Sequence, residues 1–114
     1  MHASRAGYCY VVRCTFAPAA SPTAKRWLEW LRDKHLAEVL AAGALDAQIV
    51  RIDGPVEQYE IHYRFADKAG FEVYERDHAP RLREEGLARF PLNLGLEFER
   101  RSGAIIHAQE NDQG

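Results

Sequence analysis

At Gln58–Phe65 the sequence reads QYEIHYRF, with a ring or an aliphatic side chain at every second position. Successive side chains of a strand point to opposite faces. One face of this segment is therefore apolar and carries Tyr59, Ile61, Tyr63 and Phe65, while the other carries Gln58, Glu60, His62 and Arg64. Such alternation is typical of a strand with one buried face. We predict a strand from Val56 to Ala66.

The segments on either side of this strand predict the rest of a sheet. Leu45–Ile52 forms a second strand, because Asp53-Gly54-Pro55 makes a tight turn into Val56. Nearer the N-terminus, Tyr8–Phe16 alternates in the same way, with Tyr8, Tyr10, Val12, Cys14 and Phe16 on one face. Beyond Pro91, alternation through Leu92, Leu94, Leu96 and Phe98 predicts a fourth strand that reaches toward Ile106.

Two helical segments separate these strands. The first is predicted from Pro22 to Ala42, with Ser21 as its cap and Gly43 after its end. Its apolar stripe comprises Ala24, Trp27, Leu28, Leu31, Val39 and Ala42, and also contains His35. The second starts after Asp67 and is interrupted at Asp77-His78-Ala79-Pro80, since proline disfavours helical geometry before it. We predict pieces at 68–77 and 80–89.

Four strands and two helical segments in this order predict an α+β fold of the ferredoxin-like β-α-β-β-α-β type, with a four-stranded antiparallel sheet. The first strand should lie between the third and the fourth. We expect one domain over residues 8–106, with flexible termini at 1–7 and 107–114. Helices should cover one face of the sheet, so the other face is solvated or covered by another molecule.

Composition and charge exclude several classes of protein. Fifteen basic and 17 acidic residues are interleaved, giving a net charge of −2 without the basic stripe of a nucleic-acid-binding protein. No apolar stretch reaches membrane-span length, and Met1–Gly7 lacks the core of a secretion signal, so we expect a cytoplasmic protein. Cys9 and Cys14 would lie about 16 Å apart in one strand, too far for a disulfide. No ligand spacing indicates a structural metal, and no cofactor is predicted.

Two sequence motifs resemble those of a known family. The first helix carries Trp27-Leu28-Glu29-Trp30, His35, Val39-Leu40 and Gly43, and the second carries His78-Ala79-Pro80-Arg81-Leu82-Arg83 followed by Glu85-Gly86-Leu87-Ala88-Arg89-Phe90. Together, over roughly Tyr8–Ile105, they resemble the small bacterial family catalogued as domain of unknown function 4286. The resemblance implies a dimeric α+β barrel, in which the open sheet faces of a homodimer meet. Related barrels include cofactor-independent monooxygenases, muconolactone isomerases and haem-binding enzymes, but the family itself has no assigned activity.

The polar face of the sheet supplies the first candidate site. Arg13 on the first strand should lie between the third strand, with Glu60, His62 and Arg64, and the fourth, with Glu97 and Glu99. If this face lines the interior of a dimer, His62 and Glu60 form an acid–base pair beside Arg13. We take these three as catalytic candidates and Arg64 and Glu97 as ligand-binding candidates. The alternative is a solvated face with structural charge pairs.

Three residues of the helices are further ligand-binding candidates. His35 lies on an apolar stripe, where it needs a hydrogen-bond partner or the edge of a cavity; its structural alternative is a core histidine bonded to a carbonyl, Glu38 or Tyr63. His78 precedes the proline break and could equally cap the second piece of the helix. Trp30 lies off the main stripe and could cover a loop, a dimer contact or the rim of a pocket.

Three functional interpretations therefore remain open. The first is a pocket on the polar sheet face, with His35 and His78 at its edge, that binds a small polar or anionic molecule or performs cofactor-independent catalysis. The second is a dimerisation or interaction module without catalysis. The third is a haem- or metal-binding barrel, although His35, His62 and His78 lie on different elements. The sequence decides neither whether the protein is an enzyme nor what it binds.

Overall fold

The computed structural model describes residues 7–111 and has the predicted order of strands and helices. The regular elements are β1 (Gly7–Phe16), α1 (Ser21–Trp30), α2 (Leu36–Ala41), β2 (Asp46–Arg51), β3 (Glu57–Phe65), α3 (Lys68–Asp77), α4 (Ala79–Arg89) and β4 (Leu96–Ile105). A π-helical turn, η2 (Leu31–His35), makes α1 and α2 one continuous helical segment. Of the termini expected to be flexible, residues 1–6 and 112–114 lie outside the described part.

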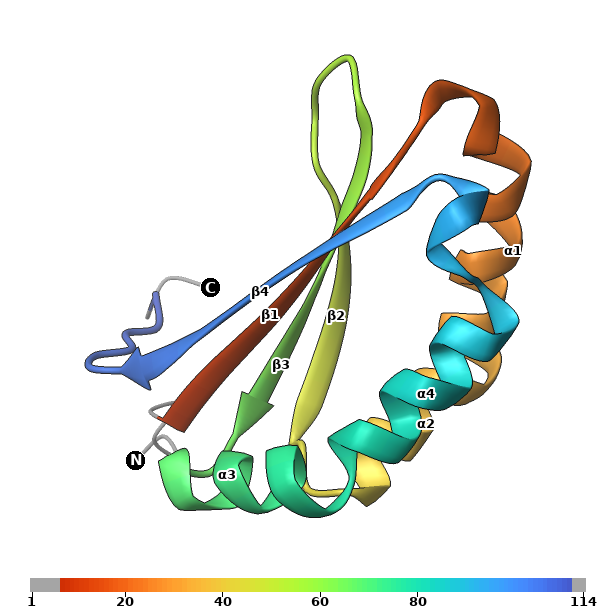
Figure 1. The fold of residues 1–114 in the computed structure, drawn as a ribbon. Helices are drawn as coiled ribbons and strands as arrows, with labels where there is room; N and C mark the ends of the chain where they lie inside the picture. The colour runs from red at the N-terminus through yellow and green to blue at the C-terminus, as the bar shows by residue number, and fades with distance from the viewer. Residues whose placement is uncertain (1–6, 112–114) are drawn as a thin grey trace.

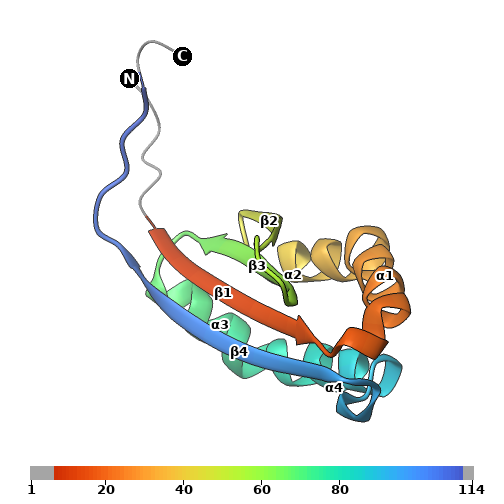
Figure 2. The ribbon, with the colours of Figure 1, turned by 90° about the horizontal axis from the view of Figure 1, so that it is seen from above.

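The four strands form one antiparallel sheet in the order β2-β3-β1-β4, so β1 lies between β3 and β4 as predicted. In the register, Arg13 stands opposite Glu60 on one side and Glu99 on the other. The helices lie on one side of the sheet (Figures 1 and 2). Within residues 7–111, no helix covers the other side. The chain therefore has the ferredoxin-like α+β fold.

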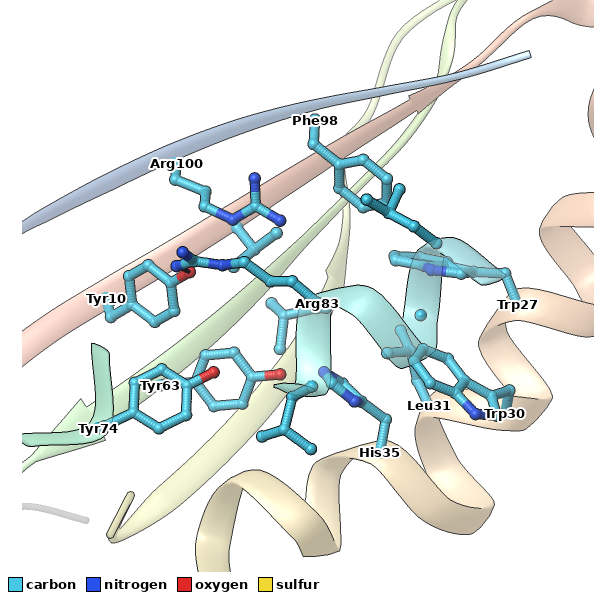
Figure 3. Close-up of a pocket in the computed structure, with 15 residues that line it drawn as sticks. Tyr10, Trp27, Trp30, Leu31, His35, Tyr63, Tyr74, Arg83, Phe98 and Arg100 are labelled. Atoms are coloured by element: carbon cyan, nitrogen blue, oxygen red, sulfur yellow. Dashed lines mark hydrogen bonds between the residues drawn. The ribbon is translucent and has the colours of Figure 1, made fainter. Parts of the chain in front are cut away.

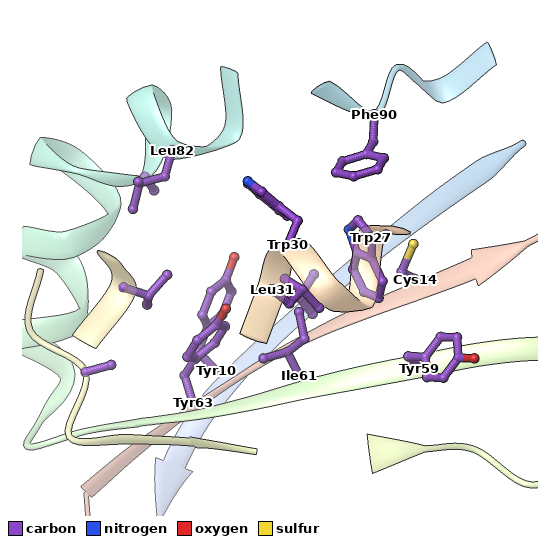
Figure 4. Close-up of a cluster of buried hydrophobic side chains, with 14 of the residues drawn as sticks. Tyr10, Cys14, Trp27, Trp30, Leu31, Tyr59, Ile61, Tyr63, Leu82 and Phe90 are labelled. Atoms are coloured by element: carbon purple, nitrogen blue, oxygen red, sulfur yellow. The ribbon is translucent and has the colours of Figure 1, made fainter. Parts of the chain in front are cut away.

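The hydrophobic core fills the space between the sheet and the helices, as Figure 4 shows for part of it. The alternation of β1 and β3 supplies its sheet side, from Tyr8, Tyr10, Val12, Cys14, Phe16, Tyr59, Ile61, Tyr63 and Phe65, all buried. The helices contribute Trp27, Leu31 and Val39 from α1, η2 and α2, and Leu82 from α4. The phases read from the sequence for both strands are confirmed.

Two local predictions are wrong. Leu92 and Leu94 belong to a 3-10 turn, η3 (Leu92–Leu94), and not to the fourth strand. Gly95 ends that turn with φ 98°, a backbone conformation that favours glycine, and β4 begins only at Leu96. Ser21 is itself helical and makes no capping hydrogen bond, because a second 3-10 turn, η1 (Pro18–Ala20), leads directly into α1.

The predicted break of the second helical segment is confirmed. Asp67 caps α3, since its Oδ1 accepts the N–H of Gly70 at 2.7 Å. The helix ends at Asp77, and α4 starts at Ala79 with Pro80 in its first turn, where a proline needs no hydrogen-bond acceptor. His78 lies between the two helices. No helix within residues 7–111 is long and apolar enough to cross a membrane.

Candidate functional site

A cavity of about 60 Å³ lies inside the molecule, between the helix-covered face of the sheet and the helices (Figure 3). Most of its wall is aromatic or aliphatic. The sheet contributes Tyr10, Val12, Ile61, Tyr63, Phe98 and Arg100; the helices contribute Trp27, Trp30, Leu31, His35, Tyr74, Leu82, Arg83, Gly86 and Leu87. No aspartate or glutamate is among these lining residues, whereas two arginines are. The wall of the cavity is therefore mainly apolar, and its charged side chains are both positive.

The π-helical turn η2 shapes the helical wall of this cavity. At the end of the turn, the N–H of Leu36 donates to the carbonyl oxygen of Leu31, five residues earlier. In a regular α-helix, residues five apart are about 140° apart around the axis, and the wider turn reduces this angle. Trp30 and His35 consequently stack, with ring centroids 4.5 Å apart and an interplanar angle of 21°. Single π turns are frequent at functional sites.

His35 is a neutral side chain at ordinary pH. Burial lowers the pKa of its imidazole to about 4, partly opposed by the negative charge of Glu85 on α4. Its Nδ1 atom is buried and has no hydrogen-bond partner among the described residues. The predicted structural role, a bond to a carbonyl, to Glu38 or to Tyr63, is therefore absent there. The ring points from the helix toward the sheet side of the cavity (Figure 3).

Three tyrosines from different elements form the opposite wall. Tyr10 stacks on Tyr63 at 5.8 Å between ring centroids and lies 6.1 Å from the ring of Tyr74. The Tyr10 hydroxyl accepts a hydrogen bond of 2.9 Å from Arg83. Neither Tyr63 nor Tyr74 makes a side-chain hydrogen bond within residues 7–111. Burial raises the pKa of both hydroxyls well above the usual range of tyrosine, so both keep their protons.

Two arginines carry the positive charge of the cavity wall. Arg83 on α4 is also paired with Glu75 on α3, which partly compensates its charge. Arg100 on β4 lies over the ring of Phe98, 5.4 Å from its centroid. In the described part of the chain, no carboxylate is within ion-pair distance of Arg100. Its guanidinium is thus available to an anion.

The cavity adjoins a wider groove at the edge of the sheet. The groove encloses about 520 Å³ between β4 and α4 and is lined by Arg83, Leu87, Leu92, Leu96, Glu97, Phe98, Glu99 and Arg100. Four of these residues, Arg83, Leu87, Phe98 and Arg100, also line the cavity. The cavity and the groove are therefore adjacent, and both arginines belong to their shared wall.

The open sheet face carries the charge cluster expected from the sequence. Arg13 Nε and Nη2 donate to Glu60 Oε2 at 2.9 and 2.7 Å, and His62 Nε2 lies 2.8 Å from Glu60 Oε1. The bond with His62, aided by the bonds from Arg13, lowers the pKa of the Glu60 carboxyl. Arg101 approaches the same carboxylate at 3.4 Å. Glu60 is only 4% exposed although its face is open, because these side chains cover it.

The remaining predicted site residues are dispersed. Arg64 pairs with Asp46 on the open face at 2.8 Å. Glu97 is exposed at the sheet edge and lines the outer groove. His78 is half-buried between α3 and α4 and lines neither the cavity nor the groove. Trp30 is buried in the cavity wall, with Phe90 5.6 Å from its ring centroid.

These positions correct the predicted outline of the pocket. We expected His35 and His78 at the edge of a pocket that also held Arg13, Glu60 and His62. His35 and Trp30 face the helix-covered side of the sheet, whereas the Glu60 cluster lies on its opposite side. A four-stranded sheet separates the two groups, so they cannot contact one ligand.

Sequence reasoning missed the polar residues of the enclosed cavity. The alternation places Tyr10 and Tyr63 on the apolar faces of their strands, which is correct for their rings but gives no information about their hydroxyls. Arg100 had a readable signal, because it follows Leu96 and Phe98 at the inward-facing phase of β4. An arginine at that phase should have indicated a polar opening in the core. Arg83 lies on α4 next to the fully buried Leu82, which gives no comparable signal.

The geometry of the described residues does not support the third interpretation, a metal or haem site. Throughout residues 7–111, no three histidine, cysteine, aspartate or glutamate side chains come together as metal ligands. Cys9 and Cys14 are both free thiols, on opposite faces of β1.

Solved structures with the same fold cover nearly the whole chain. A dimeric ferredoxin-like protein from an uncultured marine organism is 15% identical, with 92% of this chain and 100% of that one covered and a TM-score of 0.64. A monooxygenase from the gene ActVA-Orf6 of Streptomyces coelicolor, in complex with the ligand nanaomycin D, is 15% identical over 95% of both chains, with a TM-score of 0.69. HapK from Hahella chejuensis is 13% identical over 91% and 97%, with a TM-score of 0.64. These identities show a common fold.

The sequence itself has one informative match. No curated protein sequence matches the chain significantly. The model of one protein family matches residues 10–99, which include most of β1, both helical segments, β2, β3 and the start of β4. The chain therefore belongs to the family described as domain of unknown function DUF4286.

Proposed function

We propose that this protein binds a small ring-containing molecule with an oxygen-bearing polar group in the cavity between its sheet and its helices. One observation carries the proposal: the cavity is lined by aromatic rings and two arginines, without any carboxylate. Binding sites for small molecules are typically apolar clefts with a few placed polar groups. The ring would pack among Trp27, Trp30 and Phe98, and the polar group would face Arg100.

One structural neighbour is described with a small-molecule ligand. The Streptomyces coelicolor monooxygenase of the same fold was crystallised with nanaomycin D. A shared fold does not transfer a reaction, so the proposal for this chain is confined to binding and rests on its own side chains. Any part of a ligand that exceeds the cavity volume of about 60 Å³ would extend into the adjoining groove of about 520 Å³.

Intrinsic fluorescence tests the proposal directly. The chain has two tryptophans, and both Trp27 and Trp30 line the cavity. Titration with benzoate should change their emission and saturate, and benzyl alcohol of similar size should bind more weakly, since it lacks the charge that Arg100 attracts. Arg100→Met should remove most of the preference for benzoate.

A mouth-blocking variant locates the binding site. Leu87 lines both the cavity and the groove and is 44% exposed, so Leu87→Phe adds volume at the opening with little disturbance of the core. Leu45, which is 52% exposed and lines neither the cavity nor the groove, provides the matched control Leu45→Phe. Weakened benzoate binding in the first variant alone supports the proposal. Equal binding in both variants, or no saturable change at all, contradicts it.

We also propose that the protein forms a homodimer through its open sheet face, which gives the second functional interpretation a structural role. Val11 and Glu60 are only 6% and 4% exposed at the centre of this face. Around them, the basic residues Arg13, Arg64 and Arg101 alternate with acidic Asp46 and Glu99, so two copies can pair opposite charges. The marine ferredoxin-like neighbour is described as dimeric. Sedimentation equilibrium should give twice the chain mass, and a monomer at micromolar concentration would contradict this.

A further inference from the structure

The hydroxyls of Tyr63 and Tyr74 are the most conspicuous polar groups without a function in the fold. The two residues are 2% and 3% exposed, and neither hydroxyl has a protein partner within residues 7–111. Both residues line the cavity, where their hydroxyls are free to donate to a bound molecule. Both hydroxyls are directed the same way, toward the space between Arg83 and His35 (Figure 3). A molecule that enters the cavity can therefore accept hydrogen bonds from both hydroxyls.

The charges around these hydroxyls determine which kind of chemical group can bond to them. The titratable and charged residues that line the cavity are Tyr10, Tyr63, Tyr74, His35, Arg83 and Arg100. Burial keeps the two tyrosines protonated, and it keeps His35 uncharged. The wall thus offers two O–H donors and two guanidinium groups. Glu75 pairs with Arg83, whereas no carboxylate within residues 7–111 is at ion-pair distance from Arg100. Such an environment stabilises a negatively charged oxygen more than a neutral one.

We propose that the cavity binds its ligand as an oxyanion, a phenolate or enolate, whose oxygen accepts hydrogen bonds from the Tyr63 and Tyr74 hydroxyls. This inference rests on the proposed function of the cavity and names its ligand class. A phenol or enol that enters releases its O–H proton to solvent, and its oxygen keeps the electron pair. The arrangement resembles an oxyanion hole, in which fixed donors face a developing negative charge. The protein would thus hold an electron-rich conjugated anion in an apolar enclosure.

4-Nitrophenol is a suitable probe, because the absorption spectrum of its phenolate differs from that of the phenol. Equilibrium dialysis gives the bound amount, and the spectrum of the bound probe gives its ionised fraction at each pH. We expect the bound probe to ionise roughly 1 to 2 pH units below the free probe, a shift typical of a carboxyl or hydroxyl held by strong donors. 4-Nitroanisole, which cannot ionise, measures binding without this effect and should bind more weakly at neutral pH.

Phenylalanine variants identify the donors. Tyr63→Phe and Tyr74→Phe remove one hydroxyl each and keep the rings that pack in the core. Each should lose about half or more of the shift while still binding 4-nitroanisole in a saturable way. Tyr59→Phe is the matched control, since Tyr59 is equally buried in β3 but donates to Glu57 at 2.7 Å and does not line the cavity. Circular dichroism of every variant verifies its fold.

The outcomes separate this inference from the proposed function. A bound probe that ionises at or above the pH of the free probe overturns the oxyanion, even if both nitro compounds bind. A shift that persists in both tyrosine variants overturns the assignment of the donors. If neither 4-nitrophenol nor 4-nitroanisole binds, the proposed binding function fails and the oxyanion fails with it.

Discussion

His35 should make the fold less stable in mild acid. Its pKa falls from 6.5 to about 4 on folding, since burial disfavours the charged imidazole. Between these two pKa values, the imidazole is therefore protonated in the unfolded chain but largely neutral in the folded chain. The contribution of neutral His35 to the free energy of unfolding is fully present above the unfolded pKa. It decreases as the pH falls from the unfolded toward the folded pKa, and it is lost completely below the folded pKa.

The size of the effect follows from the same two values. A difference of about 2.5 pKa units corresponds to roughly 3.4 kcal/mol in total, at about 1.4 kcal/mol per unit. Between about pH 7 and about pH 4.5, most of it is lost, roughly 2.5 kcal/mol. This is a large part of the stability of a typical small domain, about 5 to 15 kcal/mol.

Urea unfolding of the wild type and of His35→Gln at both pH values measures the contribution. Acidification also affects carboxylates whose pKa is lowered in the fold, such as Glu60 and Glu85, but these are present in both proteins. We expect the wild type to lose roughly 2.5 kcal/mol more than the variant on acidification. His107→Gln, on the exposed C-terminal segment, is the control and should behave as the wild type. An equal loss in wild type and His35→Gln would refute a buried, neutral His35.

Three further predictions concern the core, the thiols and the open face. Leu82→Ala should lower the free energy of unfolding by about 2 to 5 kcal/mol, because Leu82 is 1% exposed; no change in urea unfolding would argue against its burial between α4 and the sheet. One of two thiols should react with Ellman's reagent in the native protein, since burial raises the pKa of Cys14 to about 12 while Cys9 is half-buried; two equally fast thiols would contradict this. Glu60→Gln should destabilise the fold by about 1 to 3 kcal/mol by leaving Arg13 without its carboxylate, whereas the exposed Glu97→Gln should be neutral in the same assay; equal effects would show that the cluster contributes nothing.

The sheet could be predicted closely because alternation carries its information locally. In β1 and β3 each inward residue is apolar, and in β3 the outward residues Gln58, Glu60, His62 and Arg64 are all polar, so the sequence indicates which face each side chain occupies. Local rules also located the break at Pro80 and the cap at Asp67. They failed at Leu92 and Leu94, whose alternation continues into β4 but whose backbone closes a 3-10 turn.

The enclosed cavity could not be predicted because it depends on packing between distant elements. A helical wheel separates Trp30 from His35, and only the π turn brings them together. In the sequence, Tyr63 and Tyr74 look like ordinary core residues. Only the structure shows that their hydroxyls have no partner within the described residues. The polar sheet face, by contrast, was readable from the alternation, and it drew attention to the open face and away from the cavity on the helix-covered side.

The central claim is that the ligand binds on the helix-covered side of the sheet and not on its open face. Two-dimensional NMR of the isotope-labelled protein tests it most directly, because the indole N–H signals of Trp27 and Trp30 report the cavity and the ring signals of His62 report the open face. With increasing 4-nitrophenol, both indole signals should shift along one saturating curve while the His62 signals stay in place. Saturating shifts of His62 with unchanged indole signals would contradict the account.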